Sequence, residues 1–231
     1  MFKTRSHELE FIDTGDYTAE EYEGCLIELR RINRWLGDES ALKNSLLREI
    51  GKANLQNFSV LDIGAGSGEF LRIIAKFARQ QNRQANLFGL ELNARSASSI
   101  LEESKDFSEI SAIRGNALSL PFDNNIFDYT ICSLFTHHFT DENIIKILAE
   151  MKRVSRRKIF VIDLHRHPLA YLLYTTAGKI VIKNRLTRHD GALSILRAFK
   201  PEELEELARK ASLENVTVER HFPFRLVLSG S

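Results

Sequence analysis

Along most of the chain, short apolar runs alternate with segments whose apolar residues recur at helical spacing. The apolar runs predict buried strands, and the amphipathic segments between them predict helices. The predicted strands are 58–63, 86–92, 110–114, 127–132, 158–164, 215–221 and 224–228, and the predicted helices are 18–36, 40–50, 69–82, 93–104, 140–151 and one that begins at Pro201. Strands that alternate with helices form right-handed βαβ units, so we expect an α/β fold with a mainly parallel sheet.

Polar residues mark the starts of several predicted helices. Thr18 with Glu21 has the spacing of a capping box, and Asn93 and Thr140 stand where N-cap residues are expected. The regular alternation stops after residue 164, because residues 165–199 are irregularly apolar and basic. We therefore expect an insertion there, followed by a helix and an antiparallel pair of strands.

The charge is balanced overall but uneven along the chain. Its 32 Lys and Arg residues against 31 Asp and Glu residues leave a net charge of +1, which is unlike a general nucleic-acid binder. Residues 1–24 hold seven acids and two bases, whereas residues 152–200 hold twelve bases and two acids. This basic segment is interpreted either as a solvated face or as a surface that faces an anion.

Membrane and secretory signals are weak. The longest apolar-rich stretch, residues 169–182, has 14 residues and contains Lys179, which makes it too short to span a bilayer. The first ten residues lack the apolar core of a signal peptide. Two cysteines cannot form a disulfide scaffold, so a reducing, cytoplasmic location is expected.

A glycine cluster follows the first predicted strand and opens the next helix. Gly64, Gly66 and Gly68 lack side chains, which lets a ligand approach the backbone at the end of the strand. Their spacing, G-x-G-x-G, differs from the G-x-G-x-x-G of dinucleotide sites and disfavours a nicotinamide-dependent oxidoreductase. Asp62 precedes the cluster, and Glu91 ends the next strand, where an acid can accept both ribose hydroxyls of an adenosine.

These residues, followed by the segment 115–122 (GNALSLPF) and by Phe127-Asp128, resemble the class I S-adenosylmethionine-dependent methyltransferases. The chain is most similar to their small-molecule branch, which includes ubiquinone and menaquinone biosynthesis methyltransferases. The resemblance implies a three-layer Rossmann-like fold with a mainly parallel seven-stranded sheet and an antiparallel last strand. It also implies one domain with four parts: an N-terminal helical cover (1–52), a cofactor-binding core (53–164), a substrate-side insertion (165–199) and a C-terminal helix with a strand pair (200–231).

The resemblance further implies S-adenosylmethionine as cofactor and assigns its binding residues. The glycine loop would line the methionyl part, Asp62 would support the loop and the amino group, and Glu91 would hold the ribose. The full set of expected cofactor residues is Asp62, Gly64, Ala65, Gly66, Gly68, Glu91, Leu92, Asn116, Ala117, Ser133 and Leu134.

Histidines are the candidate bases, because their pKa lies near working pH. His138 follows the fourth predicted strand, and His165 and His167 follow the fifth; each also fits a hydrogen-bonded structural role. No Asn-Pro-Pro-Tyr motif follows the fourth strand, which disfavours amino methylation of adenine or glutamine. The acidic cluster of metal-dependent catechol-type enzymes is not evident either, so we expect no metal ligands.

The sequence therefore predicts metal-independent methyl transfer to a small hydrophobic acceptor, either neutral or anionic. Phenolic, quinone-like and polyketide-like acceptors fit, with the methyl group placed on oxygen or on a ring carbon. Two alternatives stay open: a non-catalytic S-adenosylmethionine-binding partner protein, and an RNA methyltransferase that uses the basic segment. The apolar residues of 165–199 would wall the acceptor pocket, pack on the sheet or a second subunit, or contact a membrane surface.

Overall fold

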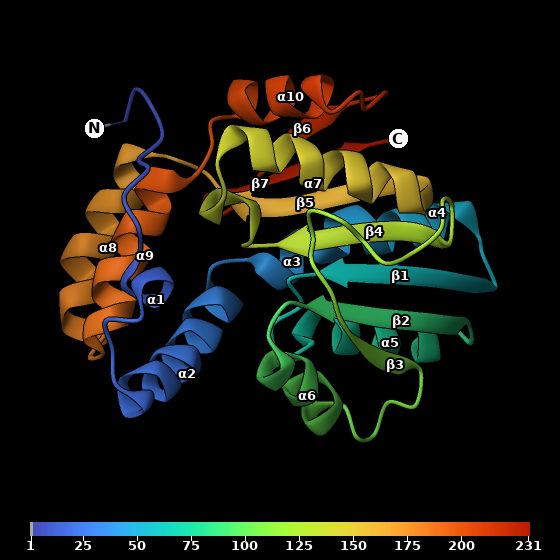
Figure 1. The fold of residues 1–231 in the computed structure, drawn as a ribbon, viewed down its shortest axis with the longest axis horizontal. Coiled ribbons are helices and arrows are strands. Elements are labelled where there is room, and N and C mark those ends of the chain that lie inside the picture. Colours follow the sequence, from blue (N-terminus) through green and yellow to red (C-terminus); the bar gives the residue numbers. More distant parts are fainter. Residues whose placement is uncertain (1) are drawn as a thin grey trace.

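The computed structural model describes residues 2–231, and the side chains at positions 13, 19, 23, 26, 30, 33–35, 179 and 180 lie outside this description. Within residues 2–231, seven strands form one sheet in the order β3-β2-β1-β4-β5-β7-β6 (Figure 1). The strands are β1 (Asn57–Ile63), β2 (Gln84–Glu91), β3 (Ile110–Arg114), β4 (Phe127–Ser133), β5 (Ser155–Leu164), β6 (Thr217–His221) and β7 (Arg225–Gly230).

Strands β1 to β5 pair in parallel, and β7 pairs antiparallel with both β5 and β6. The strand order reverses between β1 and β4, which creates the crevice where open α/β sheets bind ligands. These features confirm the predicted Rossmann-like fold with its antiparallel last strand.

Helices cover both faces of the sheet, because neighbouring strand residues point to opposite sides. Leu61 packs into the core on the side of α7 and α10, whereas Val60 packs into the core on the side of α3 to α5. The helices are α1 (Phe11–Thr14), α2 (Ala19–Trp35), α3 (Asp38–Leu42), η1 (Lys43–Leu47), α4 (Arg48–Ala53), α5 (Glu69–Gln80), α6 (Ala94–Glu103), η2 (Thr136–His138), α7 (Asp141–Val154), α8 (Pro168–Val181), α9 (Arg185–Arg197) and α10 (Pro201–Lys210).

The predicted N-terminal cover divides into two parts. Helix α2 packs against α9 of the insertion, and together with α1 and α8 these helices lie beyond the carboxyl ends of the strands (Figure 1). Residues 38–53 instead form a continuous helical stretch on the sheet, with Leu42, Leu46 and Ile50 fully buried. Only the part before residue 36 therefore faces the edge of the sheet where a ligand is expected.

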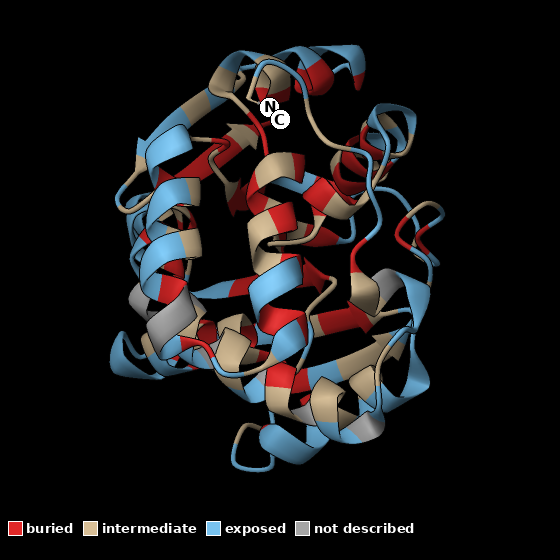
Figure 2. Cartoon of the chain, turned by 90° about the vertical axis from the view of Figure 1, so that its left-hand side faces the viewer, coloured by how far each residue is buried: buried red, intermediate tan, exposed pale blue. Residues whose placement is uncertain are grey.

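The insertion forms the two helices α8 and α9, which contact each other. Leu169, Leu172, Leu173 and Val181 are exposed to solvent. Figure 2 shows the two helices in front, α8 mostly exposed and α9 with buried, intermediate and exposed residues. No described helix combines the length and the apolar character needed to cross a membrane.

Candidate functional site

The glycine loop connects β1 to α5 at the reversal of the strand order. Gly64, Gly66 and Gly68 have φ angles of 69°, 58° and 79°, in the left-handed region that glycine adopts without strain. A Cβ atom at Gly64 would clash with the ring of Phe135, whereas one at Gly66 would meet no atom of the described residues within 4 Å. The loop is therefore covered at its first glycine and open at its second.

Two carboxyl groups lie beside this loop. Asp62 is the next-to-last residue of β1, and its Oδ1 atom is buried with no hydrogen-bond partner among the described residues. Burial, and in second place the charge of Glu91, raises the pKa of Asp62 to about 8. Glu91 accepts the N–H of Gly66 at 2.5 Å, and burial raises its pKa as well. A buried carboxyl group of this kind fits a cationic ligand group such as an ammonium, which would favour its ionised form.

The other expected cofactor residues lie at the carboxyl ends of neighbouring strands. Leu92 follows β2 and is 67% exposed, which fits a side chain that covers a bound ring. Asn116 follows β3, and its Oδ1 accepts the N–H of Leu118 at 2.9 Å. Any hydrogen bond from the adenine amino group to Asn116 would share this oxygen. Ala117 is buried in the core beside it.

Ser133 ends β4, and Leu134 follows in a left-handed conformation with φ 48°. The N–H of Leu134 donates to Ile162 on the neighbouring strand at 2.9 Å, which holds this turn in place. The residues expected to bind the cofactor thus come from the ends of β1, β2, β3 and β4, and the parallel sheet brings these ends to one edge.

The candidate bases fall into two places. His138 belongs to the short helix η2 directly after β4, and Phe135, at the start of the same turn, packs on Gly64. His165 and His167 instead line a separate hollow at the ends of β5 and β6, together with Arg220, His221 and other residues of the last strand pair. Of the three candidate bases, the structure thus brings His138 alone to the side of the glycine loop.

His167 and His165 have local roles in that second hollow. The Nδ1 atom of His167 accepts the N–H of Leu169 at 3.1 Å and caps α8. Burial, and next the neighbouring His167, lowers the pKa of His165. Leu169 follows Pro168 in the first turn of α8, so the cap is a local feature of the chain.

A buried group that sequence reasoning did not identify lies under η2. Asp163 of β5 is fully buried, and its Oδ1 lies 2.6 Å from Nδ1 of His137. Burial alone would raise the pKa of Asp163, but His137, followed by the hydroxyl of Thr136, lowers it below its ordinary value. Asp163 is the lone acid in an apolar strand, and that placement could have signalled a buried partner.

Glu10 also reaches this region from the N-terminal segment, although no sequence motif marks it. Its carboxyl group is buried, and its Oε2 atom lies 3.8 Å from Nδ1 of His138. Ser194 of α9 donates to the other oxygen at 2.8 Å. The cover therefore supplies a side chain to the edge of the sheet.

The basic residues of 152–200 serve mostly as partners within the fold. Arg166 and Arg197 are buried, and Arg166 pairs with Glu203. Several others form local ion pairs: Arg153 with Glu150, Arg156 and Arg157 with Asp128, Lys158 with Glu49, and Arg185 with Glu21. Much of the positive charge therefore holds the fold together.

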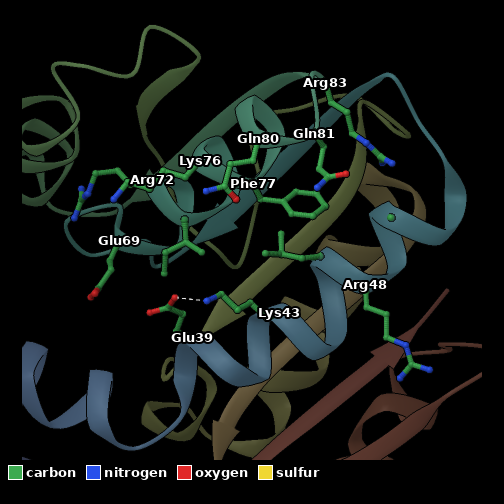
Figure 3. A pocket seen from close by; sticks show the side chains of 13 residues that line it. Glu39, Lys43, Arg48, Glu69, Arg72, Lys76, Phe77, Gln80, Gln81 and Arg83 are labelled. Carbon is green, nitrogen blue, oxygen red and sulfur yellow. Dashed lines mark ion pairs between the residues drawn. The ribbon is translucent and has the colours of Figure 1, made fainter.

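A second basic region is visible in Figure 3, between α3 to α4 and α5. This hollow contains an ion pair between Lys43 and Glu39. Its other basic lining residues are Arg48, Arg72, Lys76 and Arg83. The described residues that line it include none of those expected to bind the cofactor, so we place the functional site at the edge of the sheet.

Comparison with known proteins shows which families and folds this chain is similar to. Residues 60–158 match a family described as a methyltransferase domain. The ubiquinone/menaquinone biosynthesis C-methyltransferase of Rickettsia prowazekii is 32% identical over 103 residues, which cover 43% of this chain and 41% of that protein. The matched region spans about two-fifths of the length of the first curated relatives.

Solved structures show the same fold. An S-adenosylmethionine-dependent methyltransferase from Aquifex aeolicus has a TM-score of 0.59 at 16% identity, covering 85% of this chain and 95% of its own. The magnesium protoporphyrin IX methyltransferase of Synechocystis, crystallised with bound S-adenosylhomocysteine (SAH in its description), has a TM-score of 0.57 at 13% identity and covers 84% and 83%. Residues 60–158 thus match a methyltransferase domain, and the chain has the fold of S-adenosylmethionine-dependent methyltransferases.

Proposed function

We propose that the protein transfers the methyl group of S-adenosylmethionine to a small hydrophobic acceptor. The observation that carries the proposal is the pair of acids beside the glycine loop. Asp62 is buried with an oxygen that has no partner among the described residues, and Glu91 contacts the backbone of Gly66. A ligand with a positive charge and ribose hydroxyls matches this pair, since carboxylates stabilise an ammonium and accept hydroxyl hydrogen bonds.

Each of the expected cofactor residues has a distinct role in this proposal. Asp62 neutralises the amino group, Glu91 binds the ribose, and the open backbone at Gly66 allows close approach of the methionyl part. Leu92 covers the adenine, while Asn116 and Ala117 meet its edge. The bound cofactor supplies a sulfonium methyl group, so the protein contributes mainly alignment and acid–base groups.

The acceptor is expected to bind between η2 and the cover. Phe135 and Phe139 pack there with ring centroids 4.8 Å apart, and Phe135 also packs on Gly64. These rings offer an aromatic surface next to the glycine loop, and His138 stands in the same turn. A flat, apolar acceptor with a hydroxyl group or an electron-rich ring carbon suits this surface.

The names of similar proteins support this class of acceptor. They include C-methyltransferases of quinone biosynthesis and a magnesium protoporphyrin IX methyltransferase, and all of them name small ring systems. We therefore propose phenolic or quinone-like acceptors, with oxygen and ring carbon both open as the acceptor atom.

Calorimetric titration of the whole chain tests the cofactor part of the proposal. S-adenosylmethionine and S-adenosylhomocysteine are expected to bind with one site per chain, and NADH is expected not to bind. Binding of NADH without S-adenosylmethionine would overturn the proposal. Strong, salt-dependent binding of RNA would instead favour the RNA alternative.

Replacing Glu91 by Ala is expected to weaken S-adenosylmethionine binding about tenfold to hundredfold, because the ribose loses a charged acceptor. Glu102→Ala is the matched control, since Glu102 is exposed on α6 and is not among the expected cofactor residues. Equal dissociation constants for the Glu91 variant and the unmodified protein would remove Glu91 from the site.

A further inference from the structure

Three potential metal ligands meet at the edge of the sheet, and none of them is an expected cofactor residue. Glu10, His137 and His138 each place one ligand atom within 4.8 Å of the other two. The imidazole rings of the two histidines have centroids 4.2 Å apart. Glu10 and His137 are almost fully buried, so the cluster is not an ordinary group of surface side chains.

A second layer of contacts orients His137. Asp163 lies 2.6 Å from its Nδ1 atom, and the same carboxylate accepts the hydroxyl of Thr136 at 2.6 Å and the N–H of His137 at 3.2 Å. A carboxylate at Nδ1 holds the proton there and leaves the lone pair on Nε2. Metal-binding histidines usually have such a carboxylate or carbonyl partner on the far nitrogen.

The backbone of η2 is fixed by two arginines. Arg197 donates to the carbonyl oxygens of His137 and His138 at 3.2 and 2.6 Å, and Arg5 donates to that of His137 at 3.3 Å. Arg197 also lies 3.9 Å from Oε1 of Glu10, while Oε2 of Glu10 is the oxygen near His138. Arg5 is itself paired with Asp141, so the carboxylates of Glu10 and Asp163 outweigh the remaining charge of Arg197 and the cluster tolerates a cation.

We infer that Glu10, His137 and His138 bind one divalent transition-metal ion of the zinc, cobalt or iron(II) type. Two imidazole nitrogens and one carboxylate oxygen form a ligand set that such ions prefer. Three protein ligands leave at least one coordination position open, as in catalytic rather than structural sites. The sequence predicted no metal because Glu10 joins the histidines only when the N-terminal segment folds onto η2.

The proposed function gives this ion a task, although its binding does not depend on that function. An acceptor hydroxyl at the open position would lose its proton to water more readily, since a bound cation stabilises the oxyanion. His138 would then act on the acceptor side as a metal ligand instead of as a general base.

Cobalt titration of the metal-stripped full chain tests the inference. We expect one Co²⁺ per chain, visible absorption bands of a low-coordinate nitrogen and oxygen site, and loss of the bands when Zn²⁺ is added. His138→Ala and Glu10→Gln are each expected to weaken Co²⁺ binding at least about tenfold. His7→Ala is the control, because His7 is exposed on the same N-terminal segment.

Circular dichroism and S-adenosylmethionine binding are measured on the same samples. Variants that stay folded and still bind S-adenosylmethionine but lose Co²⁺ would support the metal site separately from the cofactor site. The inference is overturned if the unmodified chain does not bind Co²⁺, or if both variants bind it as tightly as the His7 variant does.

Discussion

Asp62→Asn is expected to weaken S-adenosylmethionine binding about hundredfold, or by about 3 kcal/mol. This substitution replaces one carboxyl group by an amide of nearly the same shape and changes no other group. The amide cannot neutralise the ammonium of the ligand. Because the pKa of Asp62 in the free protein is about 8, binding of a cation near neutral pH should also release a proton. Calorimetry in buffers of different ionisation enthalpy measures both effects.

The same substitution is expected to stabilise the free protein at alkaline pH. The ordinary pKa of this carboxyl group is 3.8 and its pKa in the folded protein is about 8, so the folded state keeps a proton that the unfolded chain releases. The free energy of unfolding therefore falls as the pH rises from about 4 to about 8, by up to about 6 kcal/mol. The amide that replaces the Asp62 carboxyl does not titrate. The stability of the variant relative to the unmodified protein should therefore increase little at about pH 4 and most above about pH 8.

Urea unfolding across this pH range measures whether the stability difference between Asp62→Asn and the unmodified protein increases with pH. Asp123→Asn is the control, because Asp123 is exposed and far from the glycine loop in the sequence. A pH-independent difference between Asp62→Asn and the unmodified protein would show that the Asp62 carboxyl is already ionised in the free state. Unchanged S-adenosylmethionine affinity would separate Asp62 from the cofactor.

Asp38→Ala is expected to destabilise the fold by about 3–5 kcal/mol. Asp38 at the start of α3 pairs with Arg225 at the start of β7, and both side chains are almost fully buried. Removing the carboxylate leaves the guanidinium buried without its partner, which costs more than losing an exposed ion pair. Urea unfolding at neutral pH measures the change.

Glu39→Ala is the matched control for Asp38→Ala. Glu39 is the next residue, and its ion pair with Lys43 is partly exposed, so this variant should change stability by less than about 1 kcal/mol. Similar losses of unfolding free energy in the two variants would mean that the buried ion pair contributes no more to stability than the exposed one. Such a result would also question the docking of residues 38–53 on the sheet through this contact.

Features encoded locally were predictable from the sequence. The capping box at Thr18 and Glu21 is present, with the N–H of Thr18 2.9 Å from Oε2 of Glu21, and Asn93 caps α6. The parallel strands and the glycine loop were also predictable from short patterns. An apolar run followed by glycines and an amphipathic segment is compatible with few local structures other than a strand, a turn and a helix. The cofactor side of the site belongs to this local class.

The proposed acceptor side depends on contacts between distant segments, which no short pattern encodes. Glu10 reaches His138 only because the N-terminal segment folds across α9, where Asp190 accepts the backbone N–H groups of Phe11 and Ile12. The surroundings of the apolar residues of α8 could not be predicted from the sequence either. Their pattern left open a pocket wall, packing on the sheet or a second subunit, and a membrane contact. In the structure α8 contacts α9, and Leu172 and Leu173 are exposed.

The most direct test of the proposed activity follows the methyl group itself. The full chain is incubated with S-adenosylmethionine labelled in the methyl group and with a small-molecule extract, and the products are analysed by mass spectrometry. We expect the label in a small, apolar, ring-containing product, and we expect its formation to fall in Glu91→Ala but not in Glu102→Ala. Tight binding of S-adenosylmethionine with no label transferred to any extract component would contradict the proposed activity and favour a non-catalytic binding protein.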